Sequence, residues 1–212
     1  ASRRIRCTLQ VAAFPPPGIP GEDGVMPSPR LQVELPPWVD GFVDWQRHYP
    51  RLEDRMALVV DLGREQVRRA TGGPFAAAVF ERDSGVLVAV GVNMAVPAHN
   101  CVLHAEAVAL MMAGARLHSH SLGVAGMPAH ELVSSCEPCA MCIGATLWSG
   151  VARLVTGAAK ADAEAIGYDE GPVFPESYAY LARKGVAVVR EVLRDQARTL
   201  FTEYQAAGGV IY

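Results

Sequence analysis

The clearest periodic stretch of the chain follows Pro50. Apolar or small residues recur there at every third or fourth position: Leu52, Met56, Val59, Gly63 and Val67. This period places them on one face of a helix, which Pro50 opens and the run Thr-Gly-Gly-Pro at 71–74 ends. Two apolar runs, at 75–80 and 86–92, then flank Arg82-Asp83-Ser84-Gly85, which predicts a β-hairpin.

Helical and strand patterns alternate after the hairpin and a loop at 93–100. We expect strands at 131–135, 151–156 and 186–189, and helices at 104–117, 141–148, 159–165, 177–183 and 192–204. Such alternation is typical of a layered α/β fold. There is no internal repeat and no sign of a boundary between two large domains.

The first 49 residues follow a different pattern, because prolines interrupt them throughout. The prolines at 15–17, 20, 27, 29 and 36–37 prevent a long helix or a central strand. Short strands are compatible with 3–11 and, at a sheet edge, with 31–35. We interpret 1–49 as a proline-rich N-terminal extension, 50–207 as one globular domain, and 208–212 as a C-terminal tail after the helix-breaking pair Gly208-Gly209.

Composition narrows the classes of protein. The 212 residues are 50% hydrophobic and 19% charged, with a net charge of −3, which suits one domain with a substantial core. This charge makes nucleic-acid binding an unexpected role. No apolar run reaches about 18 residues, so we expect no membrane span, and Arg3, Arg4 and Arg6 precede no apolar run that would make a secretory signal. Five cysteines, three of them closely spaced, favour metal binding in a reducing cytoplasm over disulfides.

The candidate chemistry lies in Cys136-Glu137-Pro138-Cys139-Ala140-Met141-Cys142 and in His104-Ala105-Glu106. Imidazole and thiolate are ligands that zinc prefers, and a catalytic zinc keeps three protein ligands and one open position. Zinc deaminases have a glutamate two residues after the histidine and a proline before the thiol pair. We therefore expect Zn²⁺ on His104, Cys139 and Cys142, with Glu106 as the catalytic acid and base. A structural zinc with Cys136 as a fourth ligand, or an iron–sulfur site, is the alternative.

These motifs resemble the cytidine/deoxycytidylate deaminase superfamily over roughly residues 51–204, and within it the likeness is greatest to bacterial guanine deaminases. The resemblance also rests on Gly72-Gly73-Pro74-Phe75, Gly91-Val92-Asn93 and an aromatic residue followed by two acids at 168–170. It implies a three-layer α/β/α fold with a mixed sheet of about five strands. It further implies that 50–207 form a zinc-dependent deaminase domain that hydrolyses guanine, a small-molecule nucleobase, to xanthine and ammonia.

The same resemblance implies the roles of further residues. Asn93 would hydrogen-bond the purine, and Glu170 would be a second catalytic acid, with Asp169 taking that place if the loop register shifts by one. Phe75 and Trp148 match aromatic positions near the base. The family usually has Asp where this chain has Glu170, and this difference would leave room for another amino-heterocycle, such as the aminotriazine ammeline.

In guanine deaminases of this type the C-terminal segment closes the active site of a partner subunit. We therefore expect a homodimer with exchanged C-termini, in which Gly208-Gly209 is the hinge and Tyr212 reaches over the pocket. The rival functions are a tRNA adenosine deaminase, which should have a basic face, and a cytidine or nucleoside deaminase. A zinc-stabilised binding module without catalysis is a further alternative, and the presence of Glu106 argues against it.

Overall fold

The structure, a computed structural model, describes residues 31–212. The chain divides into two units, at 1–34 and 35–212. The strand expected at 3–11 lies outside the described residues. The strand expected at 31–35 is wrong, because within the described residues no strand of the sheet pairs with that segment.

A five-stranded mixed sheet forms the centre of the second unit, in the order β2-β1-β3-β4-β5. The strands are β1 (Ala76–Glu81), β2 (Leu87–Val92), β3 (His130–Cys136), β4 (Arg153–Ala158) and β5 (Ala187–Val189). β1 is antiparallel to both β2 and β3, whereas β3, β4 and β5 run parallel to one another. The expected hairpin and the expected mixed sheet are both confirmed.

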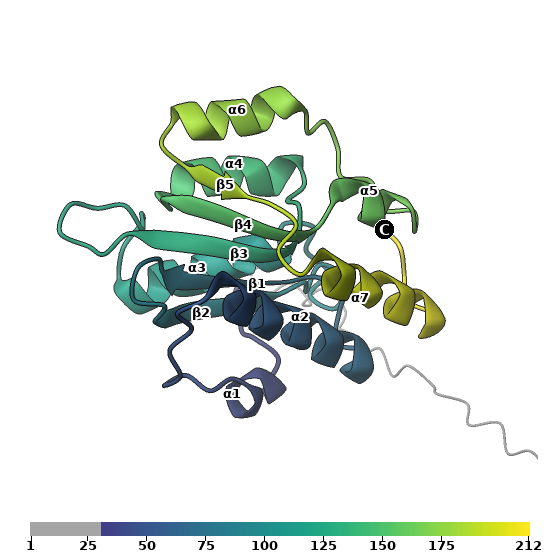
Figure 1. Ribbon diagram of the computed structural model, residues 1–212. Helices are drawn as coiled ribbons and strands as arrows, with labels where there is room; N and C mark the ends of the chain where they lie inside the picture. Colours follow the sequence, from purple (N-terminus) through teal and green to yellow (C-terminus); the bar gives the residue numbers. More distant parts are fainter. Residues whose placement is uncertain (1–30) are drawn as a thin grey trace, which may run out of the picture. The chain divides into compact units, whose positions relative to one another are not determined.

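Helices cover both faces of this sheet, as a three-layer α/β/α fold requires (Figure 1). On one face α2 (Leu52–Arg69) packs beside α7 (Arg194–Ala206), and on the other α3 (Ala105–Leu117) packs beside α4 (Ala140–Ser149). The short α5 (Lys160–Glu164) contacts α7, and α6 (Pro175–Arg183) contacts β5. Most boundaries lie within two residues of those the pattern predicts.

Residues 35–49, which the sequence places in the N-terminal extension, belong to the compact unit. They contain a five-residue helix, α1 (Trp38–Phe42), which the sequence pattern does not predict. The side chains of Val39, Val43 and Tyr49 are buried there. This segment therefore contributes apolar surface to the core, although it follows the Pro36-Pro37 pair.

A close approach of α3 to β2 sets the position of the helix that begins after His104. A Cβ on Gly91 would lie 2.2 Å from the carbonyl oxygen of Ala105 and 2.4 Å from the backbone nitrogen of Ala109. Only glycine leaves room for this contact. On α3 itself, the small side chains of Ala105, Ala109 and Ala113 are fully buried against the sheet. The start of α3 is thereby held close to the end of β2.

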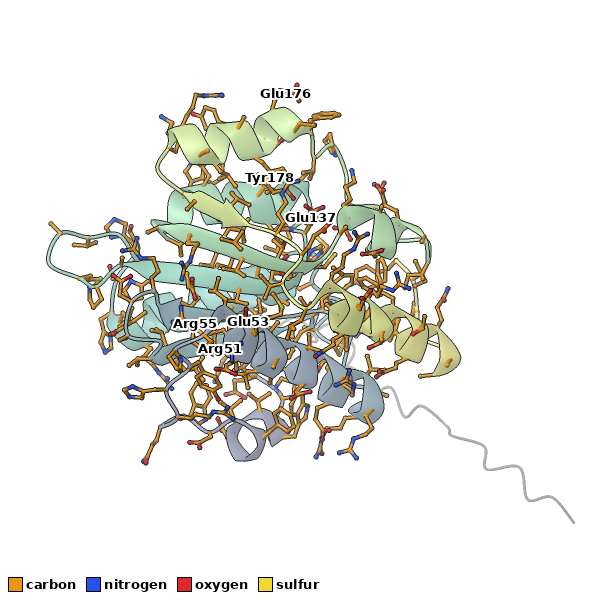
Figure 2. The ribbon with its side chains drawn as sticks, in the orientation of Figure 1. Arg51, Glu53, Arg55, Glu137, Glu176 and Tyr178 are labelled. Carbon is orange, nitrogen blue, oxygen red and sulfur yellow. The ribbon has the colours of Figure 1, made fainter. Side chains whose placement is uncertain are left out.

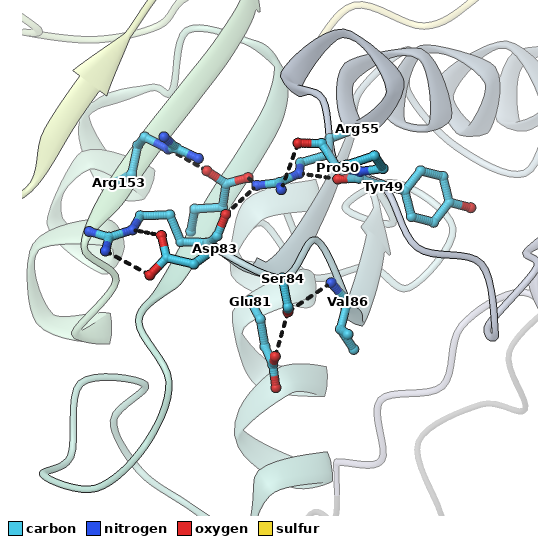
Figure 3. Close-up of polar contacts among 10 residues, drawn as sticks. Tyr49, Pro50, Arg55, Glu81, Asp83, Ser84, Val86 and Arg153 are labelled. Atoms are coloured by element: carbon cyan, nitrogen blue, oxygen red, sulfur yellow. Dashed lines mark hydrogen bonds and ion pairs between the residues drawn. The ribbon is translucent and has the colours of Figure 1, made fainter.

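A buried charge cluster fixes the other end of the central strand (Figure 3). Glu131, near the start of β3, accepts hydrogen bonds from Arg55 of α2 and from Arg153 of β4. Arg55 also donates to the backbone oxygens of Tyr49, at 2.6 Å, and of Arg82, at 2.9 Å. The cluster ties α2, β3 and β4 together at the end of β3 that lies opposite Cys136.

Candidate active site

The N-termini of α3 and α4 meet where β3 ends. His104 and Cys139 are the N-cap residues of these two helices, and Cys142 lies in the first turn of α4. His104 Nδ1 is 3.5 Å from Cys139 Sγ, and one donor atom from each of the three residues lies within 4.8 Å of the others. The structure thus brings the three predicted metal ligands together.

This donor set fits a zinc ion. Zinc bonds of about 2.3 Å to sulfur and about 2.0 Å to nitrogen, at a tetrahedral angle, separate the two atoms by about 3.6 Å. The observed 3.5 Å between His104 and Cys139 agrees with that separation. Hydrogen bonding with Cys142 and with His104 lowers the pKa of Cys139. A helix N-terminus also favours the thiolate form that binds metal.

Cys136 is not part of this group. Its thiol points to the carbonyl oxygen of Ala159 at 3.6 Å, and burial raises its pKa well above the usual value. A neutral thiol that donates to a carbonyl is a poor metal ligand. Within residues 31–212 the metal group therefore consists of His104, Cys139 and Cys142, which leaves a fourth position open, as in catalytic zinc sites.

Glu106 is the second residue of α3 and is buried beside the donor set. Ser134 of β3 donates a hydrogen bond from Oγ to its Oε1 at 3.2 Å. Burial, and after it the neighbouring Cys139, raise the pKa of Glu106. A carboxyl group with a raised pKa is suited to take up and release a proton near neutral pH.

A small cavity opens in front of these residues. Its volume is about 120 Å³, and ten residues line it: Phe75, Asn93, His104, Glu106, Glu137, Cys139, Tyr168, Asp169, Glu170 and Tyr212. Eight of them are residues that the sequence analysis singled out. Four are acidic, and the lining contains no lysine or arginine. The cavity therefore presents negative or neutral groups to whatever binds there.

Asn93 is held firmly at the end of β2. Its Oδ1 accepts hydrogen bonds from the backbone nitrogen of Ala95, at 3.2 Å, and from the hydroxyl of Tyr212, at 2.7 Å. Its own backbone oxygen accepts a bond from Gln66 Nε2 at 2.7 Å. The side-chain amide is therefore fixed in one orientation, as recognition of a planar ligand edge requires.

Aromatic rings form one wall of the cavity. The ring of Tyr168 packs edge-on against Phe75, with centroids 4.9 Å apart, and against Tyr212, with centroids 5.7 Å apart. Phe75 also packs on Phe201 of α7 at 5.6 Å. Tyr212, the last residue, thus closes the cavity of its own chain in this structure.

Glu170 and Asp169 differ in their surroundings. Asp169 is exposed and accepts a bond from the backbone nitrogen of Gly171 within its own loop. Glu170 is buried, and burial together with the nearby Glu106 and Cys139 raises its pKa to about 8. Of the two acids, Glu170 has the environment of a group that exchanges protons with a ligand.

Trp148 does not lie at the cavity, in contrast to the expectation from the sequence. Its side chain is 77% exposed near the end of α4. Six residues separate it from Cys142, which corresponds to about 9 Å along a helix. Conversely, the sequence analysis missed Glu137 and Tyr168 as lining residues. Both stand inside motifs that it had quoted: Glu137 precedes Pro138-Cys139, and Tyr168 is the aromatic residue before the acid pair.

Residues 50–158 match a family described as the cytidine and deoxycytidylate deaminase zinc-binding region. Over 124 residues the chain is 32% identical to the guanine deaminase of Bacillus subtilis (strain 168), an alignment that covers 58% of this chain and 75% of that protein. A solved structure of the guanine deaminase from Nitrosomonas europaea is 46% identical, with a TM-score of 0.80, and the match covers 84% of this chain and 97% of that one. A structure in complex with 2,6-diaminopurine is 48% identical, also with a TM-score of 0.80, and covers 85% and 95%.

Proposed function

The chain belongs to the zinc-dependent cytidine and deoxycytidylate deaminase family, and from this we propose that it hydrolyses guanine to xanthine and ammonia. One observation carries the proposal most directly. The buried carboxyl group of Glu106 stands beside a group of three metal-binding atoms, at the wall of a cavity of nucleobase size.

The residues of this chain can supply each step except activation of the water. A zinc ion held by His104, Cys139 and Cys142 would lower the pKa of a water molecule to about 7 and so provide a nucleophile at neutral pH. Glu106 takes a proton from this water as its oxygen bonds to C2 of guanine. Glu106 passes this proton to the ring nitrogen. It then takes the proton of the new C2 hydroxyl group and passes it to the amino group, and the C2–N bond breaks to release ammonia and leave the C2 carbonyl of xanthine.

The cavity favours a free base over larger substrates. Its volume of about 120 Å³ is below the roughly 300–1,000 Å³ typical of sites for drug-sized ligands. Its lining contains no lysine or arginine that could bind the phosphate groups of a nucleotide or of tRNA. Tyr212 further narrows its mouth. These features argue against the alternative of a tRNA adenosine deaminase.

The remaining specificity rests on Asn93 and Glu170. The fixed amide of Asn93 would bind the purine edge, and Glu170, with its pKa near 8, would donate a proton or a hydrogen bond to the ring. Phe75 and Tyr168 would pack against the base. Ammeline is a second candidate substrate, because it carries a guanine-like edge on a single ring.

We further propose that the protein is a homodimer with exchanged C-termini and acts in the cytoplasm. Tyr212 reaches Asn93 of its own chain in this structure, and the same contact made across a dimer would place each tail on the partner's cavity. Three cysteines of the site region are free thiols, which suits a reducing compartment. No helix among residues 31–212 has the length and apolar character needed to cross a bilayer.

Metal analysis and an ammonia-release screen test the proposal together. We expect about one zinc per chain and release of ammonia from guanine. Ammeline, adenine, cytosine and their nucleosides are tested as alternative substrates in the same assay. Protein that contains zinc but releases ammonia only from adenosine or cytidine would refute guanine as the substrate. Protein purified with zinc present that holds none would refute the mechanism.

A further inference from the structure

Lys160, the first residue of α5, contacts two loops of the active site at once. Its backbone nitrogen donates a 2.9 Å hydrogen bond to Glu137 Oε2, in the loop that carries the metal-binding thiols. Its side-chain Nζ donates a 2.8 Å hydrogen bond to the carbonyl oxygen of Gly171, the residue after Glu170. The sequence analysis gives Lys160 no role, and it does not line the cavity.

Glu137 anchors the thiol loop on its side of this connection. Its backbone nitrogen donates to the carbonyl oxygen of Ala158 at 2.8 Å, and its Oε1 pairs with Arg190 Nε at 3.3 Å. The guanidinium of Arg190 lies over the ring of Tyr178 at 3.8 Å, which limits its movement. Figure 2 shows Glu137 beside α5 and Tyr178 below α6. The carboxylate of Glu137 therefore holds the backbone of Lys160 at a defined position.

A backbone hydrogen bond connects the loop of Glu170 to the start of α4. The backbone nitrogen of Ala140, next to Cys139, donates to the carbonyl oxygen of Glu170 at 3.1 Å. Gly171 has a positive φ of 67°, and a Cβ there would lie 3.3 Å from that of Ala140. The bond from Lys160 ends on the carbonyl oxygen of Gly171, the next residue of the same loop. Without the bond from Lys160, the loop would keep the hydrogen bond from Ala140 to Glu170 as its tie to the start of α4.

Lysine suits this position for physical reasons. Its side chain is long enough to span from the start of α5 to the loop, and its ammonium group offers three donors. One donor serves Gly171 and another pairs with Glu164, one turn along α5, at 3.3 Å. The side chain is only 25% exposed, and the carboxylate of Glu164 offsets part of the cost of burying its charge. A neutral side chain of the same length would fill the space but would leave the carbonyl without its partner.

We propose that Lys160 is a positioning residue that sets the place of the Glu170 carboxyl group relative to the metal ligands. The inference rests on the proposed function, in which Glu170 acts on the substrate. Lys160 itself touches neither substrate nor metal. Displacement of a catalytic group by about 1 Å can cost about a hundredfold in rate, so loss of this bond should reduce activity without removing the metal.

A double-mutant cycle tests this role. In the unmodified protein, Lys160→Met should lower kcat/KM for guanine by about tenfold to a hundredfold. In the Glu170→Gln background it should change kcat/KM less than twofold, because the group it positions is already disabled. Zinc content should stay the same in all four proteins. Lys184→Met, an exposed lysine at the end of α6, is the matched control and should behave like the parent.

Hydrogen–deuterium exchange supplies a readout that does not depend on turnover. In Lys160→Met, amides of 168–173 should exchange at least about tenfold faster than in the parent and in Lys184→Met. Should Lys160→Met not fold, Lys160→Arg, which keeps a donor but changes its reach, is measured in the same cycle.

Equal losses in both backgrounds, or unchanged exchange of 168–173, would overturn the positioning role. If 168–173 exchange faster in Lys160→Met than in the parent, but the parent does not turn over guanine, the proposed function alone would be refuted.

Discussion

The hydroxyl of Tyr212 donates a 2.7 Å hydrogen bond to Oδ1 of Asn93, so the last residue of the chain is tied to the residue that follows β2. The tail that brings it there is itself held in place. Tyr204 of α7 donates from its hydroxyl to the carbonyl oxygen of Val210 at 2.9 Å, and Gly209 lies directly against the Tyr204 ring. The chain end therefore forms one wall of the cavity, although Tyr212 is 46% exposed.

Removing this wall should weaken catalysis. Deletion of residues 210–212 removes both the ring of Tyr212, which packs on Tyr168, and its hydrogen bond. Tyr212→Phe removes the bond alone, which is worth about 0.5–1.5 kcal/mol. We expect kcat/KM for guanine to fall about twofold to tenfold in Tyr212→Phe and further in the deletion. A deletion variant with unchanged kcat/KM would show that the tail is no lid.

Mixing two impaired variants should reveal whether the tails are exchanged. We would combine Glu106→Gln chains, which keep the tail, with chains that lack 210–212. If tails cross between subunits, half of randomly formed dimers are mixed and one of their two sites is complete, so about a quarter of all sites should recover activity. A mixture no more active than the separate variants would show that each tail closes the site of its own chain.

The sequence was sufficient to predict the metal site because its residues fall in two short motifs, each with a local spacing. The proline before Cys139, the one-turn spacing to Cys142 and the two-residue spacing from His104 to Glu106 depend only on how helices begin, and the structure keeps all three. Whether a residue faces the cavity depends on packing between distant segments. Trp148 is an example, since its place at the far end of α4 follows from helix rise, whereas only the fold determines what lies next to it.

The same limit explains two other differences. Tyr168 lines the cavity because its ring packs against Phe75 and Tyr212, and both contacts span many residues of the chain. The helix α1 forms just after Pro36-Pro37, where composition favours an irregular segment. The burial of Val39 stabilises it, and burial cannot be deduced from a stretch of five residues.

Replacing Glu106 with glutamine should abolish turnover and leave the metal in place. Glutamine has the same shape and can still accept the hydrogen bond from Ser134, but it cannot carry a proton. General acid–base catalysis contributes about 10²–10⁴-fold, so kcat should fall at least that far. Zinc content and thermal stability should stay near those of the parent. Ammonia release within tenfold of the parent would contradict the role assigned to Glu106.

Glu170 should make the stability of the metal-free protein depend on pH. Burial raises its pKa from 4.5 to about 8, so between these pH values the folded protein holds a proton that the unfolded chain has released. Stability therefore falls as pH rises through this range. Glu170→Gln should remove this decline and should be the more stable form above pH 8, by on the order of 4 kcal/mol.

Denaturant unfolding of the chelated proteins at pH 5, 7 and 9 measures the difference. Asp169→Asn, in the same loop but exposed, is the matched control. Added zinc should weaken the dependence, because a nearby cation lowers the pKa of a carboxyl group. If the stability of the parent and of Glu170→Gln changes in parallel with pH, Glu170 has the same pKa in the folded protein and in the unfolded chain.

The charge cluster at the start of β3 should matter for stability and not for chemistry. Arg55 is 2% exposed and Glu131 fully buried, so Arg55→Met leaves the carboxylate of Glu131 with Arg153 as its remaining partner. It also leaves the backbone oxygens of Tyr49 and Arg82 without their donor. Breaking a buried pair from one side costs about 3–5 kcal/mol. We expect a loss of that size in the free energy of unfolding. Asp83→Asn breaks the exposed pair of Arg82 with Asp83 and should cost far less stability, because solvent screens a surface ion pair. If the two variants lose equal stability, the cluster is no more than a surface ion pair in energy, and α2 must be held to the sheet by its apolar face alone.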